Sequence, residues 1–313
     1  MLQVINTLLP VFVVIGLAFW LARRGWLSQI FINELNWLIF WVSLPALIIH
    51  SLVTAESLPK DALPAIGIFT AATLLLIVLA FLTSRWLQLP RERVGTFVQS
   101  AFRGNLAFAG LPFVVFAVEG IQPDKVGAAV AQVMFILAPA MLLYNVLAVL
   151  VLTLSQQSVS TSMLRGSVGK VAGNPLILAS IIGVALFALP FELPKFALST
   201  LGLIGQMAAP AALFCVGGGM AFVSMEGRYR SASYASALKV IIMPALTAGL
   251  LLLVEVDPIA RLVLLILSAC PTAVASYIMA KALDGDEALA AGSIILSTLA
   301  CIPSVGLIIA LSL

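Results

Sequence analysis

The stretch VQSAFRGNLAFAGLPFVVFAV, residues 98–118, decides how the chain folds. It is apolar enough to lie in a membrane, yet it carries Gly104, Gly110 and Pro112 near its middle. Proline removes an amide donor and clashes with the preceding helical turn, and glycine weakens a helix. We therefore expect an unwound stretch here, shielded from lipid by other helices. The alternative is a proline-kinked packing helix.

A second stretch, RLVLLILSACPTAVASYIMAKAL at residues 261–283, is interrupted in the same way. Pro271 and Thr272 lie at its middle, and Ser276 and Tyr277 follow about one turn later. Two such breaks let two half-helices begin near the membrane centre, each with roughly half a positive charge at its N-terminus. Such N-termini suit an anionic substrate group. The equivalent positions of the two breaks favour this interpretation over two kinked helices.

Arg103 is the single residue that points most sharply to function. It follows Arg93 by ten positions, which places it about 15 Å into the membrane at about 1.5 Å per residue. A buried arginine is costly, so it needs a partner or a purpose. It attracts a carboxylate, caps the carbonyl groups of a broken helix or snorkels towards the cytoplasm, and the absence of an acidic residue at this depth slightly favours the first. Lys239 and Lys281 lie nearer predicted helix ends, where snorkelling explains them.

The composition places most of the molecular surface in lipid. Apolar residues make up 62% and charged residues 9% of the 313 residues, with a mean hydropathy of +1.18. An ordinary soluble domain is about 25% charged. All thirteen acidic residues lie in, or at the edges of, the gaps between apolar runs. The chain is therefore predicted to be an all-α membrane protein, and its net charge of +3 gives no support for nucleic-acid binding.

Apolar runs of about 20 residues, the length of a membrane-spanning helix, recur along the chain. Ten transmembrane helices are predicted, near residues 4–22, 34–53, 62–84, 94–118, 126–153, 171–190, 197–223, 233–254, 260–282 and 287–311. No gap is long enough for a soluble domain, so residues 1–313 are expected to form a single transmembrane transporter domain. No basic residue precedes Arg23, so a cleaved signal peptide is not expected.

The basic residues orient the predicted helices. Alternate gaps hold ten basic residues against four in the others, and the positive-inside rule makes the richer set cytoplasmic. Both termini are then extracytoplasmic. The ten are Arg23, Arg24, Arg85, Arg91, Arg93, Arg165, Lys170, Arg228, Arg230 and Lys281, and the four are Lys60, Lys125, Lys195 and Arg261.

The two halves of the chain, about 1–155 and 165–313, resemble each other weakly. The first and sixth runs open on Asn and Pro, and the second and seventh carry Pro45 and Pro210 past their middles. Five runs per half is an odd number, so the second half must be inserted upside down. Paired interruptions within an inverted repeat point to the binding site of a secondary transporter.

The other polar residues inside the runs are weaker signals. Candidates for a cavity are Ser43, Gln99, Asn145, Gln206 and Ser276, although each is more often an interhelical hydrogen bond. His50 is better explained as a surface or packing residue than as a proton carrier. Cys215, Cys270 and Cys301 lack metal-ligand spacing, so neither a metal nor another cofactor is expected.

Five stretches carry a family resemblance and keep their order along the chain. They are LNWLIFWVSLPALIIHSL (35–52), SAFRGNLAFAGLPFV (100–114), GNPLILASIIG (173–183), GQMAAPAALFCVGGGM (205–220) and CPTAVASYIMAKALDGDEALAAGSIILST (270–298). Together they resemble the auxin efflux carrier family of bacterial permeases and plant auxin exporters. The resemblance implies a five-plus-five inverted repeat, crossed broken helices 4 and 9, and an elevator-like movement of a transport domain against a scaffold. The crossover residues it implies are Gly104, Asn105, Gly110, Pro112, Pro271 and Thr272.

The short gap between the fifth and sixth runs favours the bacterial permease branch, which resembles carriers of malate, malonate and other small carboxylates. The family's fold is similar to that of the bile acid/sodium symporters and sodium/proton antiporters. This sequence lacks the mid-membrane carboxylates with which those relatives bind cations, and this argues against a conventional cation site.

The leading hypothesis is a secondary active transporter or uniporter that moves a small organic anion across the bacterial inner membrane. The anion is a carboxylate such as malate, malonate or an auxin-like acid, and membrane lipid is the other expected partner. Proton coupling and a homodimer both stay open. The substrate-binding candidates are Arg103, Asn105, Gly110, Pro112, Pro271, Thr272, Ser276, Tyr277 and Ser43.

Four alternatives are weighed against this hypothesis. A sodium-coupled symporter and an anion channel have the same composition, whereas paired interruptions favour a carrier over a channel. An intramembrane enzyme is not expected, because the runs contain neither paired Asp residues nor an HExxH motif. A nucleotide-binding GxxxxGK[ST] motif is also absent from the sequence, so an ATP-driven pump would need another subunit.

Overall fold

The structure is a computed structural model that describes residues 2–54, 61–155, 175–188, 193–222 and 227–312. The described residues of the first half form α1 (Leu2–Arg23), α2 (Gln29–Leu38), η1 (Ile39–Ser43), α3 (Leu44–Val53), α4 (Ala62–Trp86), α5 (Arg91–Phe102), η2 (Leu106–Gly110), α6 (Leu111–Ile121), η3 (Pro123–Lys125) and α7 (Val126–Ser155). Those of the second half form α9 (Pro175–Ala188), α10 (Lys195–Gln206), α11 (Ala208–Met220), α12 (Tyr229–Ala237), η4 (Leu238–Ile242), α13 (Met243–Leu250), α14 (Pro258–Ala269), α15 (Ala275–Ala282) and α16 (Glu287–Ser312).

Several of the described helices are long and apolar enough to cross a membrane. Six meet this criterion, at Gln29–Val53, Ala62–Trp86, Pro123–Ser155, Lys195–Met220, Tyr229–Leu250 and Glu287–Ser312. Shorter apolar helices lie at Phe12–Arg23, Leu106–Ile121 and Pro258–Ala269. Large apolar side chains cover the outer surface, among them Leu63, Leu203 and Leu252. Lipid is the solvent that such a surface suits, and the predicted class of helical membrane-spanning protein is confirmed.

Both predicted interruptions are present. In the first, α5 ends at Phe102 and Arg103 is extended, with φ −77° and ψ 92°. In the second, α14 ends at Ala269 and Cys270 is extended, with φ −63° and ψ 150°. The chain resumes a helix only at Leu106 and at Ala275. We call the two non-helical segments, 103–105 and 270–274, the crossover.

The two segments of the crossover pair with each other in an antiparallel bridge between Gly104 and Thr272. Asn105 N donates to Pro271 O at 2.8 Å, and Ala273 N donates to Arg103 O at 2.9 Å. Unsatisfied backbone groups are costly in a membrane. The pairing supplies partners inside the protein for amides that the breaks release, which explains how the chain tolerates non-helical backbone here.

Three π-helical turns, η1, η2 and η4, each end two residues before a proline, at Pro45, Pro112 and Pro244. Proline lacks an N–H and its ring clashes with the carbonyl four residues earlier. A wider turn relieves that clash without ending the helix. The positions of the prolines in the sequence predict an interruption but not its π-helical form.

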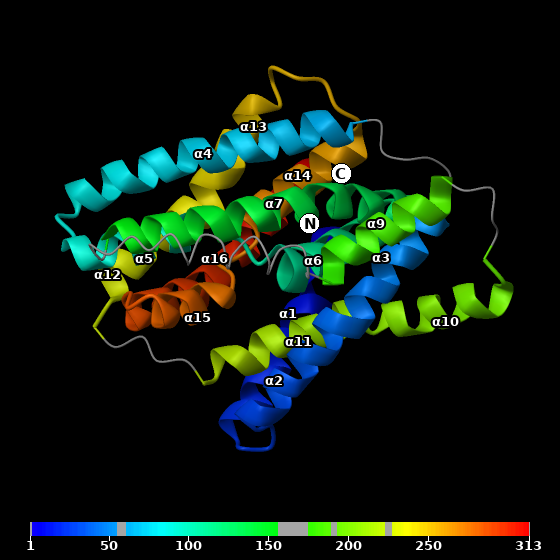
Figure 1. Cartoon of the computed structure of the whole chain (residues 1–313), viewed down its shortest axis with the longest axis horizontal. Coiled ribbons are helices and arrows are strands. Elements are labelled where there is room, and N and C mark those ends of the chain that lie inside the picture. The colour runs from blue at the N-terminus through cyan, green and yellow to red at the C-terminus, as the bar shows by residue number, and fades with distance from the viewer. Residues whose placement is uncertain (1, 55–60, 156–174, 189–192, 223–226, 313) are drawn as a thin grey trace.

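The helices pack in two groups (Figure 1). The first bundle contains α1, α2–α3, α9 and α10–α11, and the second bundle contains α4, α5–α6, α7, α12–α13, α14–α15 and α16. Within the first bundle α1 and α11 approach so closely that a Cβ atom at Gly217 would clash with Ile15 O. Across the boundary, α6 contacts α1, α7 contacts α3, and η2 contacts α11. The crossover belongs to the second bundle and faces the first.

Part of the predicted repeat falls on residues whose structure is not described. Asn174, which opens the sixth run, lies outside the described residues, and so do Lys60, Arg165 and Lys170 from the charge count. Pro210 lies in the first turn of α11, just after α10 ends at Gln206. The seventh run is therefore interrupted close to its proline, as the second is at Pro45.

Candidate substrate-binding site

A cavity of about 750 Å³ lies between the two bundles, against the crossover. Its walls come from α2 and η1, from residues 103–108, from α7, from α11, from Ala273 and Val274 of the second crossover segment and from the start of α15. It reaches Gln29 and Phe222, which are exposed at the molecular surface. Small-molecule sites have volumes of about 300–1,000 Å³ and lie between packed units, so this cavity is the leading site.

Arg103 supplies the charge of this cavity. Of the described residues that line it, Arg103 is the only one with an ionised side chain, and none is acidic. The side chain is 8% exposed, so it does not snorkel to the interface. Its Nη2 donates to Asn145 Oδ1 at 2.8 Å, and its Nη1 contacts Met279 Sδ. Neither partner is a carboxylate or a helix carbonyl, and the guanidinium therefore remains available to an anion in the cavity.

Asn105 follows Arg103 on the same wall. Hydrogen bonds hold both backbone polar groups of Asn105. Asn105 N donates to Pro271 O, and Asn105 O accepts from Ala109 N and Gly110 N. Among the hydrogen bonds of the described residues, none uses its side-chain amide. A rigid backbone with a free amide facing the cavity is the arrangement expected of a substrate-binding residue.

Other predicted site residues lie away from the cavity and hold the crossover together. Thr272 Oγ1 donates to Ser100 O at 2.8 Å, and the residue is 1% exposed. Pro271 supplies the carbonyl that accepts from Asn105. Gly110 lies against Leu267, where a Cβ atom would be 2.8 Å from Leu267 Cδ2. These residues do not line the cavity, but they hold the crossover backbone that forms one of its walls.

The remaining predicted residues divide between the cavity and the core. Tyr277 lines the cavity. Pro112 and Ser43 are buried in α6 and η1 and do not line it. Ser276 is fully buried, and its hydroxyl has no hydrogen-bond partner among the described residues. The structure thus brings Arg103, Asn105 and Tyr277 together at one cavity.

An amide face on α2 also lines the cavity, and its residues are not among the predicted site residues. Gln29, Asn33 and Asn36 line the wall opposite the crossover, with Trp37 and Phe40 beyond them. The spacing of four, three and four residues from Gln29 to Phe40 follows one face of a helix. In the sequence these amides form a polar helical face at the start of an otherwise apolar run, and that pattern could have revealed them as lining residues. Amide donors opposite a guanidinium suit an oxygen-rich ligand.

The prediction that Lys239 snorkels is wrong. Lys239 is fully buried, and its Nζ donates to Ser268 O at 2.6 Å. It lies on the π-turn η4, and its side chain reaches the crossover instead of the interface. Lys281 differs, because its side chain is 66% exposed and its Nζ lies 3.8 Å from the Glu287 carboxylate.

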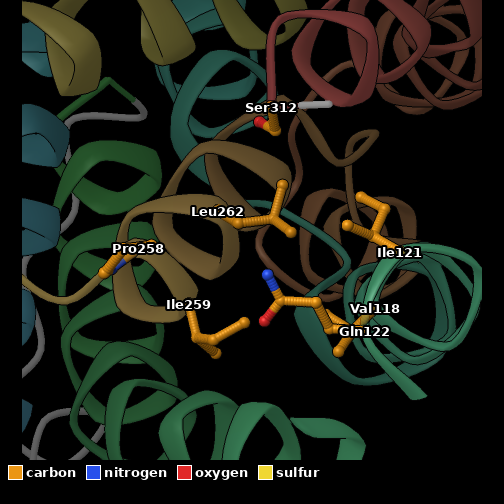
Figure 2. A pocket seen from close by; sticks show the side chains of 7 residues that line it. All are labelled: Val118, Ile121, Gln122, Pro258, Ile259, Leu262 and Ser312. Carbon is orange, nitrogen blue, oxygen red and sulfur yellow. The ribbon is translucent and has the colours of Figure 1, made fainter. Parts of the chain in front are cut away.

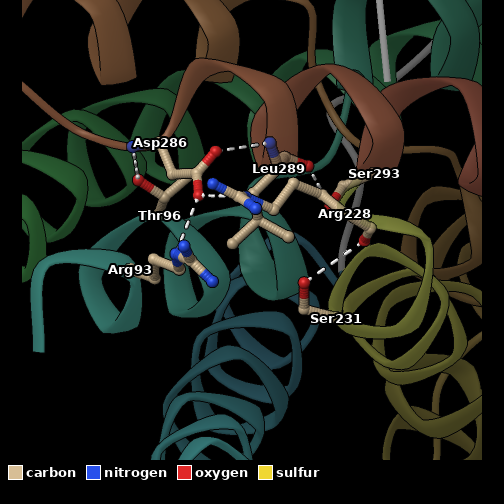
Figure 3. Close-up of polar contacts among 7 residues, drawn as sticks. All are labelled: Arg93, Thr96, Arg228, Ser231, Asp286, Leu289 and Ser293. Atoms are coloured by element: carbon tan, nitrogen blue, oxygen red, sulfur yellow. Dashed lines mark hydrogen bonds and ion pairs between the residues drawn. The ribbon is translucent and has the colours of Figure 1, made fainter. Parts of the chain in front are cut away.

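An ion cluster closes one end of the second bundle (Figure 3). Asp286 Oδ2 lies 3.2 Å from Arg93 Nε and 2.6 Å from Arg228 Nε. The same residue caps the start of α16, where Asp286 Oδ1 accepts from Leu289 N, and Asp286 N donates to Thr96 Oγ1. The cluster joins the starts of α5, α12 and α16. Since none of its members lines the cavity, its role is to hold these helix ends together.

A second hollow lies at the ends of α6, α14 and α16 (Figure 2). Its volume is about 50 Å³, and its lining is Val118, Ile121, Gln122, Pro258, Ile259, Leu262 and Ser312. The lining carries no charged side chain. A volume of this size suits water and is too small for an organic anion.

Metal-ligating residues do not gather among the described parts of the chain. Within those ranges no group of three or more His, Cys, Asp and Glu residues is close enough together to hold a metal ion. The three cysteines, Cys215, Cys270 and Cys301, are free and buried.

Comparison with known proteins identifies a membrane transport protein. The model of a family described as membrane transport protein matches residues 3–309. A comparison with curated proteins finds no match to the chain.

Proposed function

The chain belongs to the auxin efflux carrier family of membrane transport proteins, and on that premise we propose that it is a secondary active transporter or uniporter for a small organic anion. The observation that carries this proposal is Arg103, a buried cation in a cavity whose described lining has no acidic side chain. Leaving a buried charge without a counter-ion is costly. A carboxylate that enters the cavity supplies the missing partner.

The rest of the lining narrows the substrate class. Arg103, Asn105, Asn145, Asn33 and Asn36 offer hydrogen bonds to carboxylate or hydroxyl oxygens. The aromatic residues of the lining offer an apolar surface to the remainder of the ligand, and they are Trp37, Phe40, Phe108, Tyr144, Phe222 and Tyr277. Malate and malonate use mainly the polar wall, whereas an auxin-like acid uses both.

An elevator-type movement fits the division into two bundles. In this proposal the first bundle is the scaffold, and the second bundle carries the crossover across the membrane as the transport domain. The proposal includes ten transmembrane helices in a five-plus-five inverted repeat, with residues 1–313 as one transporter domain. The tight glycine contact inside the first bundle and the cavity between the bundles support it.

The orientation follows from the basic residues. With both termini outside, the exposed mouth of the cavity at Gln29 and Phe222 faces the cytoplasm, so the structure corresponds to an inward-open state of a bacterial inner-membrane carrier. Single cysteines at Gln88 and Gln122, in a background without Cys215, Cys270 and Cys301, test this in intact cells. An impermeant maleimide added outside labels Gln122→Cys and spares Gln88→Cys, and the reverse pattern contradicts the orientation.

Two other functions, a sodium-coupled symporter and an anion channel, make different predictions. A sodium-coupled symporter requires oxygen ligands for a desolvated cation, usually with a carboxylate, and the described lining of the cavity contains no acidic residue. An anion channel passes substrate without saturation, whereas a carrier saturates and exchanges. Flux measurements under an imposed proton gradient test proton coupling. Mass measurements of the purified protein test whether it is a homodimer.

Uptake by proteoliposomes is the direct experiment. Purified protein is reconstituted and given labelled malate, malonate or indole-3-acetate, with and without unlabelled anion inside and with sodium or proton gradients imposed in turn. A carrier shows saturable uptake that internal anion accelerates. Uptake that rises linearly with concentration and ignores internal anion indicates a channel, and a strict sodium requirement indicates the symporter.

A further inference from the structure

Lys239 lies in the interior of the second bundle, behind the crossover. It belongs to η4, the π-turn between α12 and α13, and none of its surface is exposed. A lysine is almost never buried in this way without a partner. None of the ion pairs formed by the described residues involves it. Its Nζ instead donates to a backbone oxygen, Ser268 O, at 2.6 Å.

Ser268 O belongs to the interrupted end of α14, where the backbone lacks its normal donors. In an unbroken helix Leu267 O, Ser268 O and Ala269 O would accept from the amides of residues 271–273. Pro271 has no N–H. Thr272 N donates to Ser297 Oγ at 2.9 Å, and Ala273 N donates to Arg103 O at 2.9 Å. Three carbonyl groups are therefore left with the partial negative charge of a helix C-terminus.

Because Gly104 has no side chain, it leaves room for the end of the Lys239 side chain. A Cβ atom on Gly104 would lie 3.0 Å from Lys239 Cε, 3.2 Å from Lys239 Nζ and 2.9 Å from Cys270 Sγ. The ammonium group consequently lies between Gly104 of the first crossover segment and the end of α14, which leads into the second. Since Gly104 and Thr272 form the bridge between those segments, the lysine is placed where the two broken helices meet.

The corresponding end of α5 is satisfied differently. There the carbonyl of Ser100 accepts from the hydroxyl of Thr272, a neutral donor. One interrupted helix end thus has a hydroxyl group and the other has a cation. Backbone carbonyls at a helix C-terminus are also the groups with which broken-helix transporters coordinate a coupling ion.

From this geometry we propose that Lys239 is a resident cation of the crossover. Its ammonium group neutralises the carbonyl end of α14 and occupies the place where a bound metal ion would lie, so that the transport bundle moves without one. The inference rests on the proposed function, because it assigns the charge that makes the transport cycle independent of sodium. Lys239 is a positioning residue, since it acts on the crossover backbone and does not line the cavity.

Replacement of the missing part of the side chain tests the inference. Lys239→Ala removes three methylene groups and the ammonium group, which n-propylammonium can supply. Lys239→Met is the matched control, because it keeps most of the volume without charge. We expect n-propylammonium to raise the melting temperature of purified Lys239→Ala in a saturable way, by about 5 °C near saturation, and to leave the wild type and Lys239→Met unchanged. The neutral analogue 1-propanol should have no such effect.

Flux measurements separate the inference from the proposed function. In proteoliposomes supplied with labelled malonate, malate or indole-3-acetate, wild-type uptake should be unchanged when choline replaces sodium. Uptake by Lys239→Met should fall about tenfold or more, and n-propylammonium should restore uptake by Lys239→Ala. If the wild type moves none of the three probes, the proposed function fails for them, and the thermal measurements still decide the role of Lys239.

Three results would overturn the inference. The first is Lys239→Met that carries the probes at the wild-type rate. The second is Lys239→Ala that 1-propanol stabilises as well as n-propylammonium does, because the site would then be only an apolar gap. The third is Lys239→Ala that n-propylammonium does not stabilise. If Lys239→Ala does not fold, the uptake rate of folded Lys239→Met, compared with the wild-type rate, decides whether the inference holds.

Discussion

The two segments of the crossover share a backbone arrangement but differ in what their side chains contact. At 103–105, Arg103 and Asn105 face the cavity, and their side chains are available to a ligand. At 270–274, the Thr272 hydroxyl donates to Ser100 O, and the preceding helix end is bonded to Lys239. The same interruption therefore has two uses. In our proposal the side chains of segment 103–105 recognise the substrate, whereas segment 270–274, of which Ala273 and Val274 also line the cavity, fastens the pair to the second bundle.

The two buried cations show the same difference. Arg103 has an amide and a thioether as partners and borders a cavity of about 750 Å³. Lys239 is sealed in protein on every side. An open cation suits a ligand that comes and goes, whereas a sealed cation suits a permanent electrostatic role. Substitutions at the two segments should consequently separate binding from stability.

The largest effect is expected from Arg103→Gln. Loss of a hydrogen-bonded charge pair with the substrate costs about 1.5–3 kcal/mol, so the apparent affinity for the transported anion should fall roughly ten- to hundredfold. Arg103→Lys keeps the charge without the planar fork and should give a smaller loss. Saturation curves of uptake measure both variants. Arg93→Gln is the matched control, because Arg228 still pairs with Asp286 when that partly exposed arginine is removed. An affinity loss in Arg93→Gln equal to that in Arg103→Gln would contradict the assignment.

The next effect concerns the space at the centre of the crossover. Gly104→Ala places a methyl group 3.0 Å from Lys239 Cε and 2.9 Å from Cys270 Sγ. Overpacking of this kind costs about 1–3 kcal/mol, so the melting temperature should fall by several degrees. Gly67→Ala is the control, since a Cβ atom at Gly67 in α4 meets no atom within 4 Å. That control should be neutral or slightly stabilising. Equal melting temperatures for the two variants would show that the crossover is not tightly packed at Gly104.

The smallest effect is expected from Thr272→Val. The substitution keeps the shape of the side chain and removes its hydrogen bond to Ser100 O. A neutral hydrogen bond contributes about 0.5–1.5 kcal/mol, so a modest fall in melting temperature is expected. Because Thr272 does not line the cavity, the apparent affinity for substrate should stay within about twofold. Saturation curves with a tenfold weaker affinity would place Thr272 in the binding site.

The sequence predicts the places of the breaks better than the roles of the residues in them. Pro112 and Pro271 mark the interruptions because proline cannot continue a hydrogen-bonded helix. Arg103 is recognisable as a functional residue because a charge at its depth needs a reason. These arguments use the chemistry of single residues, and the structure bears out the interruptions that they predict.

The roles that the sequence leaves undetermined depend on which way a side chain points. Thr272 and Asn105 have equal standing as polar crossover residues, yet only Asn105 lines the cavity. Lys239 lies close enough to a predicted helix end to suggest snorkelling, and a π-turn aims it inward. Helix rotation and tertiary packing set these directions. The amide face from Gln29 to Asn36 is the exception, since its helical spacing is visible in the sequence.

Asn105 and Thr272 lie in the two segments of the crossover, and we propose that Asn105 binds the substrate while Thr272 holds the segments together. The decisive measurement is thermal unfolding of purified Asn105→Ala and Thr272→Val, with and without the transported anion. Asn105→Ala should keep its unliganded melting temperature and lose most of the stabilisation that the anion gives the wild type. Thr272→Val should melt slightly lower and keep that stabilisation in full. Undiminished ligand stabilisation in Asn105→Ala, together with its loss in Thr272→Val, would show that the two roles are assigned to the wrong residues.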